Sequence, residues 1–114
     1  MRLNHPTGQA AEDAAWAYLQ RHGCRLVARN WHCRFGELDL IVWDGSVLVF
    51  VEVRLRRGTQ FGGAAGSLNA GKLAKVQRSA EYYLQTHPTP APCRIDALLF
   101  DNDPQPTWLR NITG

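Results

Sequence analysis

Three carboxylates and an arginine stand close together in the stretch from Gly36 to Arg57. The stretch consists of two apolar runs with a period of two, joined by Asp44-Gly45, which is typical of a β-hairpin. Opposed residues of a hairpin share a face. With Asp44-Gly45 as the loop, one face would carry all the ionisable side chains of the two runs, which are Glu37, Asp39, Glu52 and Arg54.

In this register Glu37 faces Glu52 and Asp39 faces Phe50. Carboxylates on such apolar strands repel one another and lose hydration unless a cation lies between them. A divalent metal ion with Arg54 beside it would satisfy that need. The opposite face is aliphatic and has to be covered; its residues are Leu38, Leu40, Val42, Val47, Val49, Val51 and Val53.

The composition indicates one domain over residues 1–114. Of the 114 residues, 45% are hydrophobic and 20% are charged, which suits a single core and excludes global disorder. No apolar run approaches the roughly 20 residues of a membrane span, and the N-terminus lacks the apolar core of a signal peptide. We therefore expect a cytoplasmic protein with no membrane contact.

The basic residues favour a nucleic-acid partner. The net charge is +3, and 11 of the 13 basic residues are arginine, whose planar fork suits bidentate contact with phosphate. Arginine bias also follows genomic base composition, so a plain solvated surface is the alternative. Three cysteines without C-x-x-C spacing predict reduced structural thiols and no zinc site.

Periodicity and turn residues predict the flanking elements. Apolar residues at helical spacing predict helices over residues 9–22 and 70–86, the first capped near Thr7 or Gly8 and the second by Asn69. Apolar runs predict strands over residues 24–30, 93–100 and 107–112, the last at a sheet edge. The fold class is therefore α/β, with a mixed central β-sheet flanked by helices in the order α-β-β-β-α-β-β.

Two acids outside the hairpin admit more than one role. Glu12 borders the apolar stripe of the first helix, where it either favours the helix dipole as a first-turn acid or leans over the sheet toward the carboxylates. Asp96 lies inside the strand over residues 93–100. It either pairs with an arginine such as Arg94 or takes part in chemistry.

Basic residues also follow the hairpin and line the second helix. Lys72, Lys75 and Arg78 lie off the apolar stripe of that helix, on a side that is either solvated or in contact with phosphate. The glycine-rich segment over residues 58–66 is either a connector or a lid that orders on a ligand.

These motifs resemble the PD-(D/E)XK nuclease superfamily and, more closely, the small bacterial YraN family. The superfamily carries an acid on a first helix, an Asp in the second strand and Glu-x-basic in the third, which match Glu12, Asp39 and Glu52-Val53-Arg54. The YraN motifs Gly-Glu-(Ile/Leu)-Asp-Leu-Ile, Phe-Val-Glu-Val-Lys-x-Arg and Arg-Phe-Asp match residues 36–41, 50–56 and 94–96. The resemblance covers nearly the whole chain.

The resemblance implies a restriction-endonuclease-like core, similar to Holliday-junction resolvases, and hydrolysis of phosphodiester bonds, by analogy in branched DNA. Asp39 and Glu52, with Glu12, would bind Mg²⁺ or Mn²⁺, and Glu37 and Asp96 would lie behind these ligands. Neighbouring phosphates, of DNA in preference to RNA, would be held by Arg56, Arg57, Lys72, Lys75 and Arg78. Many resolvase-like nucleases act as dimers, so a homodimer is one expected arrangement.

The chain departs from the superfamily at Arg54, where the superfamily has lysine. Arginine is always cationic and grips phosphate with two donors, but it cannot act as a base. Two alternatives therefore stand beside the nuclease. One is a catalytically impaired DNA- or RNA-binding module. The other is a protein-interaction domain in which the acids pair with arginines and Trp108 on the edge strand serves a partner.

Overall fold

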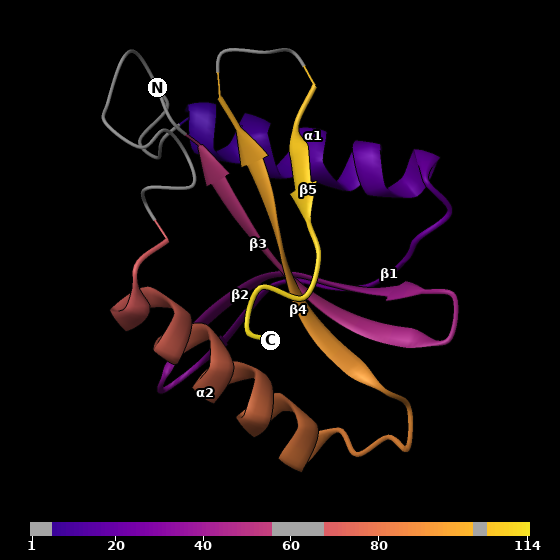
Figure 1. Cartoon of the computed structure of the whole chain (residues 1–114), viewed down its shortest axis with the longest axis vertical. Coiled ribbons are helices and arrows are strands. Elements are labelled where there is room, and N and C mark those ends of the chain that lie inside the picture. Colours follow the sequence, from indigo (N-terminus) through magenta and orange to yellow (C-terminus); the bar gives the residue numbers. More distant parts are fainter. Residues whose placement is uncertain (1–5, 56–67, 102–104) are drawn as a thin grey trace.

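The computed structural model describes residues 6–55, 68–101 and 105–114, and its sheet has five strands (Figure 1). The strands lie in the order β1-β2-β3-β4-β5, and every neighbouring pair is antiparallel except the parallel pair of β3 and β4. The predicted α/β class and element order are confirmed. In chain order the elements are α1 (Pro6–Arg21), β1 (Arg25–Cys33), β2 (Gly36–Asp44), β3 (Val47–Leu55), α2 (Ala70–Thr86), β4 (Cys93–Phe100) and β5 (Thr107–Leu109).

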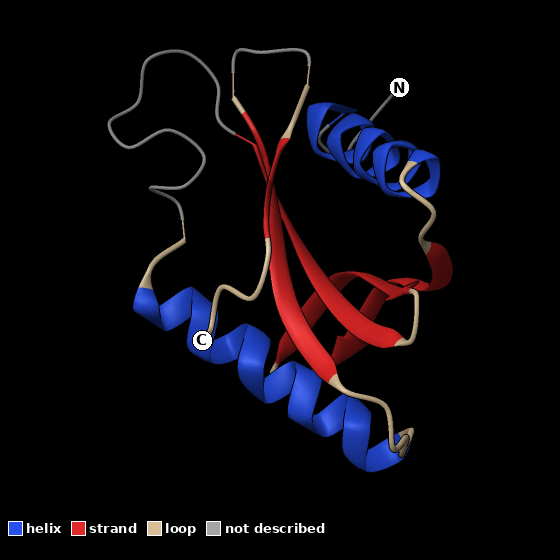
Figure 2. Cartoon of the chain, turned by 45° about the vertical axis from the view of Figure 1, so that its right-hand side comes forward, coloured by secondary structure: helices blue, strands red, loops and turns tan. Residues whose placement is uncertain are grey.

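The two helices cover opposite faces of the sheet (Figure 2). Ala11, Ala15 and Leu19 recur every four residues, so they form one buried stripe of α1, which packs on β2, β3 and β4. Val76 and Tyr83 of α2 bury the other face. Parallel strands need a long crossover, and α2 supplies the one between β3 and β4. Among the described residues, neither helix combines the length and apolarity needed to cross a membrane.

The helix ends follow from their terminal residues. Asn69 caps α2 as predicted, because its side-chain oxygen accepts a hydrogen bond from the Lys72 N–H at 3.0 Å. The α1 helix begins at Pro6, so the prediction that Thr7 or Gly8 caps it is wrong. Proline suits the first helical position because its φ is already helical and its missing N–H has no partner there. Gly23, with φ +89°, ends the helix as predicted.

The outer strands differ from the prediction in length. β1 runs three residues beyond Asn30, because Trp31 pairs with Leu38 and His32 pairs with Glu37 of β2. β5 ends at Leu109, which pairs with Ala97, and not at residue 112. β5 is an edge strand, as the sequence predicted.

The β2–β3 hairpin has a different loop from the predicted one. Asp44 pairs with Val47, so Gly45 and Ser46 form the loop. Gly45 has φ +62°, which suits the first loop residue of a type II′ turn. Each residue of β2 therefore pairs two positions later in β3 than predicted. The predicted pairs of Glu37 with Glu52 and of Asp39 with Phe50 are wrong. The even shift keeps the side chains from Leu40 to Asp44 on their predicted faces.

The alternation of β2 breaks at Asp39. Leu38 packs on the α2 side and Leu40 on the α1 side, so the prediction that they share a face is wrong. The cause lies in β1, where Asn30 has φ +51°, a left-handed conformation that asparagine tolerates. Within the described strands, pairing of β1 with β2 skips the position of Asn30 and Asp39, and the register of β2 with β3 ends at Leu40 and Val51. The sheet thus opens around Asp39.

Gly36, at the start of β2, permits close packing of this strand on α2. Gly36 has φ +152°, and a Cβ added there would lie 3.3 Å from Ser79 Oγ of α2. We expect Gly36→Ala to lower the free energy of unfolding by about 1–2 kcal/mol in urea titrations. Gly71→Ala is the matched control, because its Cβ would meet Asn69 Oδ1 at 3.4 Å within a helix, where alanine gains up to about 1 kcal/mol. Equal shifts in both variants would contradict the strain at Gly36.

Candidate metal centre

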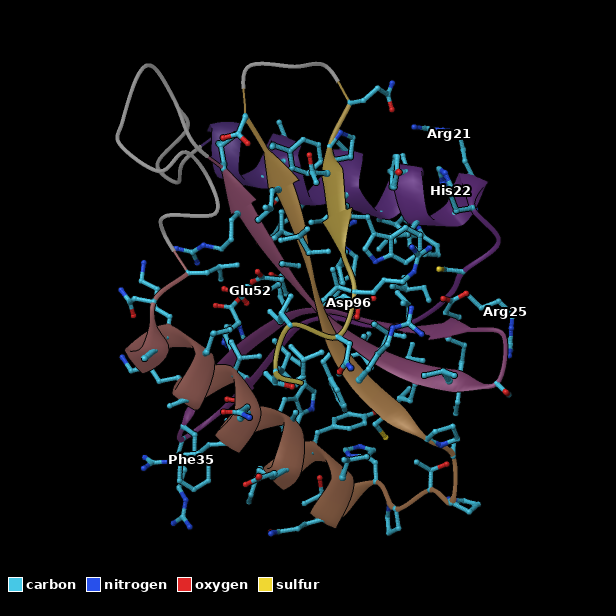
Figure 3. The ribbon with its side chains drawn as sticks, viewed as in Figure 1. Arg21, His22, Arg25, Phe35, Glu52 and Asp96 are labelled. Carbon is cyan, nitrogen blue, oxygen red and sulfur yellow. The ribbon has the colours of Figure 1, made fainter. Side chains whose placement is uncertain are left out.

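Four carboxylates from three elements gather where the sheet opens. We call them the acidic group: Glu12 of α1, Glu37 and Asp39 of β2, and Glu52 of β3. One carboxylate oxygen from each of Glu12, Glu37 and Asp39 lies within 4.8 Å of the other two, and we call these three residues the oxygen triad. Glu52 is 8% exposed, and its side chain is labelled in Figure 3.

Asp39 is held by the backbone of β3. Its Oδ2 accepts a hydrogen bond from the Val53 N–H at 2.9 Å. Pairing between the two strands has ended one residue earlier, so the carboxylate supplies the acceptor that a strand carbonyl would otherwise give. Continuing the register of Leu40 and Val51 brings Asp39 opposite Glu52. The prediction that these two acids share a face therefore holds in the folded chain.

The acidic group shifts the pKa values of its own members. Burial, and then the negative charge of Glu52, raise the pKa of Asp39 to about 8, although the Val53 N–H opposes the shift. Burial also raises the pKa of Glu52, against the charge of Arg54 and a hydrogen bond from Asp39. The burial and close approach of Asp39 and Glu52 thus favour a protonated form of the pair.

Glu12 joins the group from the helix above. Burial raises its pKa, a hydrogen bond with the Asn30 side chain lowers it, and the charge of Glu37 raises it. The first turn of α1 contains no acid, so the helix-dipole interpretation of Glu12 is wrong, and the interpretation in which it leans over the sheet is confirmed. Sequence reasoning missed Asn30. Its signal was an asparagine, a residue type that tolerates left-handed φ, at the end of a predicted strand.

Arg54 lies beside the group and pairs with one of its members. Its Nη1 donates to Glu52 Oε2 at 2.9 Å, and both side chains are largely buried. One guanidinium cannot balance four carboxylates. Among the described residues, the oxygen triad offers carboxylate oxygens, which suit Mg²⁺ or Mn²⁺ better than the softer ions that prefer sulfur or imidazole, and His32 Nδ1 lies 4.0 Å from Glu37 Oε1. The residues present therefore fit a hard divalent cation.

The three carboxylates that lie closest together are not the same three that were expected as metal ligands. Asp39 and Glu12, expected as ligands, belong to the oxygen triad. Glu37, expected behind them, contributes the third oxygen of the triad, although it is exposed. Glu52, expected as a ligand, forms an ion pair with Arg54 and a hydrogen bond with Asp39.

Asp96 is fully buried in β4 and has a separate set of partners. Its two oxygens accept hydrogen bonds from Arg94 Nε at 3.0 and 3.1 Å, from Trp108 Nε1 at 2.9 Å and from the Asn111 N–H at 2.9 Å. Arg94 also reaches Asp44 at 2.7 Å. The predicted ion pair with Arg94 is thus confirmed, and these contacts tie β5 to β4. Within the described chain, the contacts found for Asp96 do not include the acidic group.

The expected phosphate-binding residues lie partly on α2. Lys72, Lys75 and Arg78 are exposed on that helix. The Lys75 Cβ would lie 3.9 Å from a Cβ at Gly36, so this lysine stands near the strand end that carries Glu37. Arg56, Arg57 and the glycine-rich segment over residues 58–66 lie outside the described residues.

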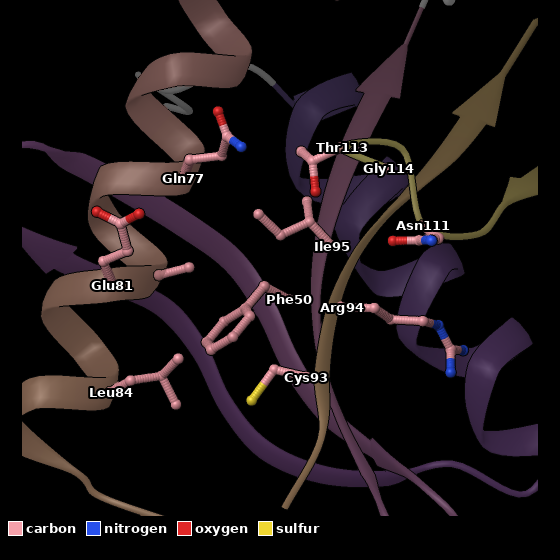
Figure 4. A pocket seen from close by; sticks show the side chains of 11 residues that line it. Phe50, Gln77, Glu81, Leu84, Cys93, Arg94, Ile95, Asn111, Thr113 and Gly114 are labelled. Atoms are coloured by element: carbon pink, nitrogen blue, oxygen red, sulfur yellow. The ribbon is translucent and has the colours of Figure 1, made fainter.

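A separate cavity of about 330 Å³ opens between α2, β4 and the C-terminal residues (Figure 4). Phe50, Leu84 and Ile95 form its apolar floor, with Glu81 and Arg94 among its polar neighbours. Its described lining residues do not include the acidic group. The cavity therefore does not take part in the candidate metal centre.

Comparison with known proteins identifies the family. The model of the uncharacterised protein family UPF0102 matches residues 11–100. A UPF0102 protein of Neisseria meningitidis serogroup C is 57% identical over the full length of both chains. A UPF0102 protein of Janthinobacterium sp. is 49% identical over 91% of this chain and 84% of its own length. The chain therefore belongs to UPF0102, the YraN-like family within the PD-(D/E)XK nuclease superfamily.

Proposed function

We propose that the protein is a metal-dependent nuclease that hydrolyses phosphodiester bonds of DNA, with branched DNA as the substrate class that the resolvase resemblance suggests. The oxygen triad supports this proposal most directly, because a cation between three carboxylate oxygens that lie within 4.8 Å of one another would offset their mutual repulsion. Burial, and then the charge of Glu52, raise the pKa of Asp39, and a cation bound beside this carboxylate would oppose that shift. We further propose that the protein acts in the cytoplasm.

The residues of the site would have two roles, metal binding and neutralisation of charge on the phosphate. Glu12, Glu37 and Asp39 would hold Mg²⁺ or Mn²⁺, and the Val53 N–H keeps the Asp39 carboxylate in place. When bound, the cation would activate a water molecule and polarise the scissile phosphate. Glu52 fixes the Arg54 guanidinium at 2.9 Å, so Arg54 can neutralise charge that develops on the phosphate but cannot accept a proton.

The test is a cleavage assay with labelled junction, flap and linear DNA in Mn²⁺. We expect wild-type protein to cut at least one branched substrate, and we expect both EDTA and Asp39→Ala to stop the reaction. Asp13→Ala is the matched control, because Asp13 neighbours Glu12 but is exposed and pairs with Arg29 at 2.7 Å. Intact substrates with wild-type protein, or the same products from Asp39→Ala, would contradict the proposal.

The second candidate is a nucleic-acid-binding module that does not cut. One observation favours it, namely that arginine occupies the superfamily's lysine position and is already bonded to Glu52. Such a module would bind nucleic acid without cleavage, and its log affinity would fall linearly with log salt concentration.

Variants of Arg54 separate the two candidates. If the protein is a nuclease, Arg54→Ala should slow cleavage by about tenfold or more, since a charge next to the phosphate is lost, and Arg54→Lys should keep most of the activity. If it is a binding module, wild-type protein leaves DNA intact and Arg54→Lys gains cleavage. Initial rates with saturating Mn²⁺ and the same labelled DNA measure both outcomes. Arg25→Ala, at an exposed position of β1, is the control for lost positive charge.

A further inference from the structure

A small cleft lies beside the turn between β1 and β2, where Phe35 stands next to α2 (Figure 3). Its volume is about 210 Å³, and we call it the stacking cleft. The Phe35 and Tyr82 rings form its aromatic wall, with centroids 5.8 Å apart and planes tilted by 70°. Both rings are partly exposed. The lining residues are Arg34, Phe35, Arg78, Glu81, Tyr82 and Gln85.

The rim of the cleft is cationic on balance. The Arg34 guanidinium lies 4.9 Å from the centroid of the Phe35 ring, and both Arg34 and Arg78 are exposed. Glu81 is the single carboxylate among the lining residues. An aromatic wall beside two arginines can stack a planar ring and hold the phosphates next to it.

The size of the cleft limits the ligand. Sites for drug-sized molecules usually measure about 300 Å³ or more, so 210 Å³ suits one planar ring better than a larger molecule. A base in a continuous duplex is stacked and paired, and it is not free to enter such a cleft. A base from a single-stranded region is free to do so.

The cleft is close to the metal centre along the chain. Phe35 lies in the turn that leads into β2, two residues before Glu37 of the oxygen triad. Lys75 of α2 stands near Gly36, between the two. A nucleic-acid strand whose base enters the cleft would therefore pass the turn that leads into β2 and to Glu37.

We propose that the stacking cleft receives an unpaired base, with the adjoining phosphates on Arg34 and Arg78. This inference rests on the proposed function, because it presumes a nucleic-acid substrate, and it names the substrate class as DNA with a single-stranded portion, such as a flap or an open junction. Glu81 repels the same phosphates, so Glu81→Gln is expected to tighten binding.

The experiment compares a flap that carries 2-aminopurine in its unpaired strand with a duplex of equal length, in Ca²⁺ to limit cleavage. Binding of wild-type protein should change the 2-aminopurine fluorescence of the flap. Phe35→Leu keeps an apolar side chain against Tyr82 but removes the stacking ring. It should weaken flap binding by about fivefold or more and leave duplex binding within about twofold.

Arg34→Ala should also weaken flap binding. Arg34 is exposed, so we expect this substitution to leave the stability of the fold unchanged. Arg110→Ala is the matched control, because Arg110 lies 3.8 Å over the Trp108 ring on β5 at the far edge of the sheet. Equal losses in Arg34→Ala and Arg110→Ala, or unchanged flap binding in Phe35→Leu, would overturn the stacking cleft. If wild-type protein cuts DNA but prefers no single-stranded portion, only this inference fails. If it binds none of these DNAs, both proposals fail.

Discussion

Asp39→Asn is expected to be more stable than wild-type protein at pH 8.5 without divalent metal, by about 1–3 kcal/mol in free energy of unfolding. Asparagine can still accept the hydrogen bond from the Val53 N–H, but it carries no charge beside Glu52. The same change should remove most of the affinity for Mn²⁺, by about 100-fold or more, because a ligand is lost.

The pH dependence follows from the pKa of Asp39. Folding raises this pKa from its ordinary value of 3.8 to about 8, so the folded protein binds the proton more tightly than the unfolded chain does. The stability that this carboxyl contributes is fully present below pH 3.8 and is lost as the pH rises toward 8. The loss has begun by pH 5.5, so the advantage of the variant should be smaller at pH 5.5 than at pH 8.5.

Urea titrations in EDTA at these two pH values measure the effect. Adding Mn²⁺ should reverse the order at pH 8.5, because ligand binding stabilises the folded wild-type protein and not the variant. A wild-type stability that does not change between the two pH values, or a variant that is weaker at both, would contradict the proposed charge strain.

The second large effect concerns Asp96. Replacing it with alanine should lower the free energy of unfolding by about 3–5 kcal/mol, since Arg94 would keep a buried charge with one partner fewer. The donors on Trp108 and Asn111 would also lose their acceptor. Thermal unfolding followed by circular dichroism would show the loss.

Asp13→Ala is the control for this change. It breaks an ion pair of similar length, between Asp13 and Arg29 at 2.7 Å, but the Asp13 side chain is 57% exposed. Its cost should be far smaller than that of Asp96→Ala, because solvent screens an exposed ion pair. Asp96→Asn keeps an acceptor for part of the network, and its folded fraction should bind Mn²⁺ like wild-type protein. Loss of Mn²⁺ binding in folded Asp96→Asn would contradict the structural role.

Local patterns in the sequence predicted most of the fold. The period-two runs of the hairpin, the cap at Asn69 and the stop at Gly23 were confirmed, because each depends on residues close in sequence. The hairpin loop was wrong by one residue. Asp-Gly and Gly-Ser both suit two-residue turns, and packing of the strands on the helices decides between them.

The candidate site was predicted in its residues but not in its arrangement. Asp39 and Glu52 meet despite the wrong loop, because the observed register differs from the predicted one by an even number of residues. The close approach of Glu37 to Glu12 depends on the break in alternation caused by Asn30, which is a tertiary effect. The acceptor role of Asp96 toward Trp108 likewise joins residues that are far apart in the sequence.

The most direct test of the central claim is a calorimetric titration with Mn²⁺ at pH 8. The account predicts saturable binding by wild-type protein and by Asp13→Asn, with release of protons from the acidic group. It predicts no saturable binding by Asp39→Asn and much weaker binding by Glu12→Gln. Absence of binding by the wild-type protein, or equal binding by Asp39→Asn, would contradict the claim that the acidic group holds a divalent cation.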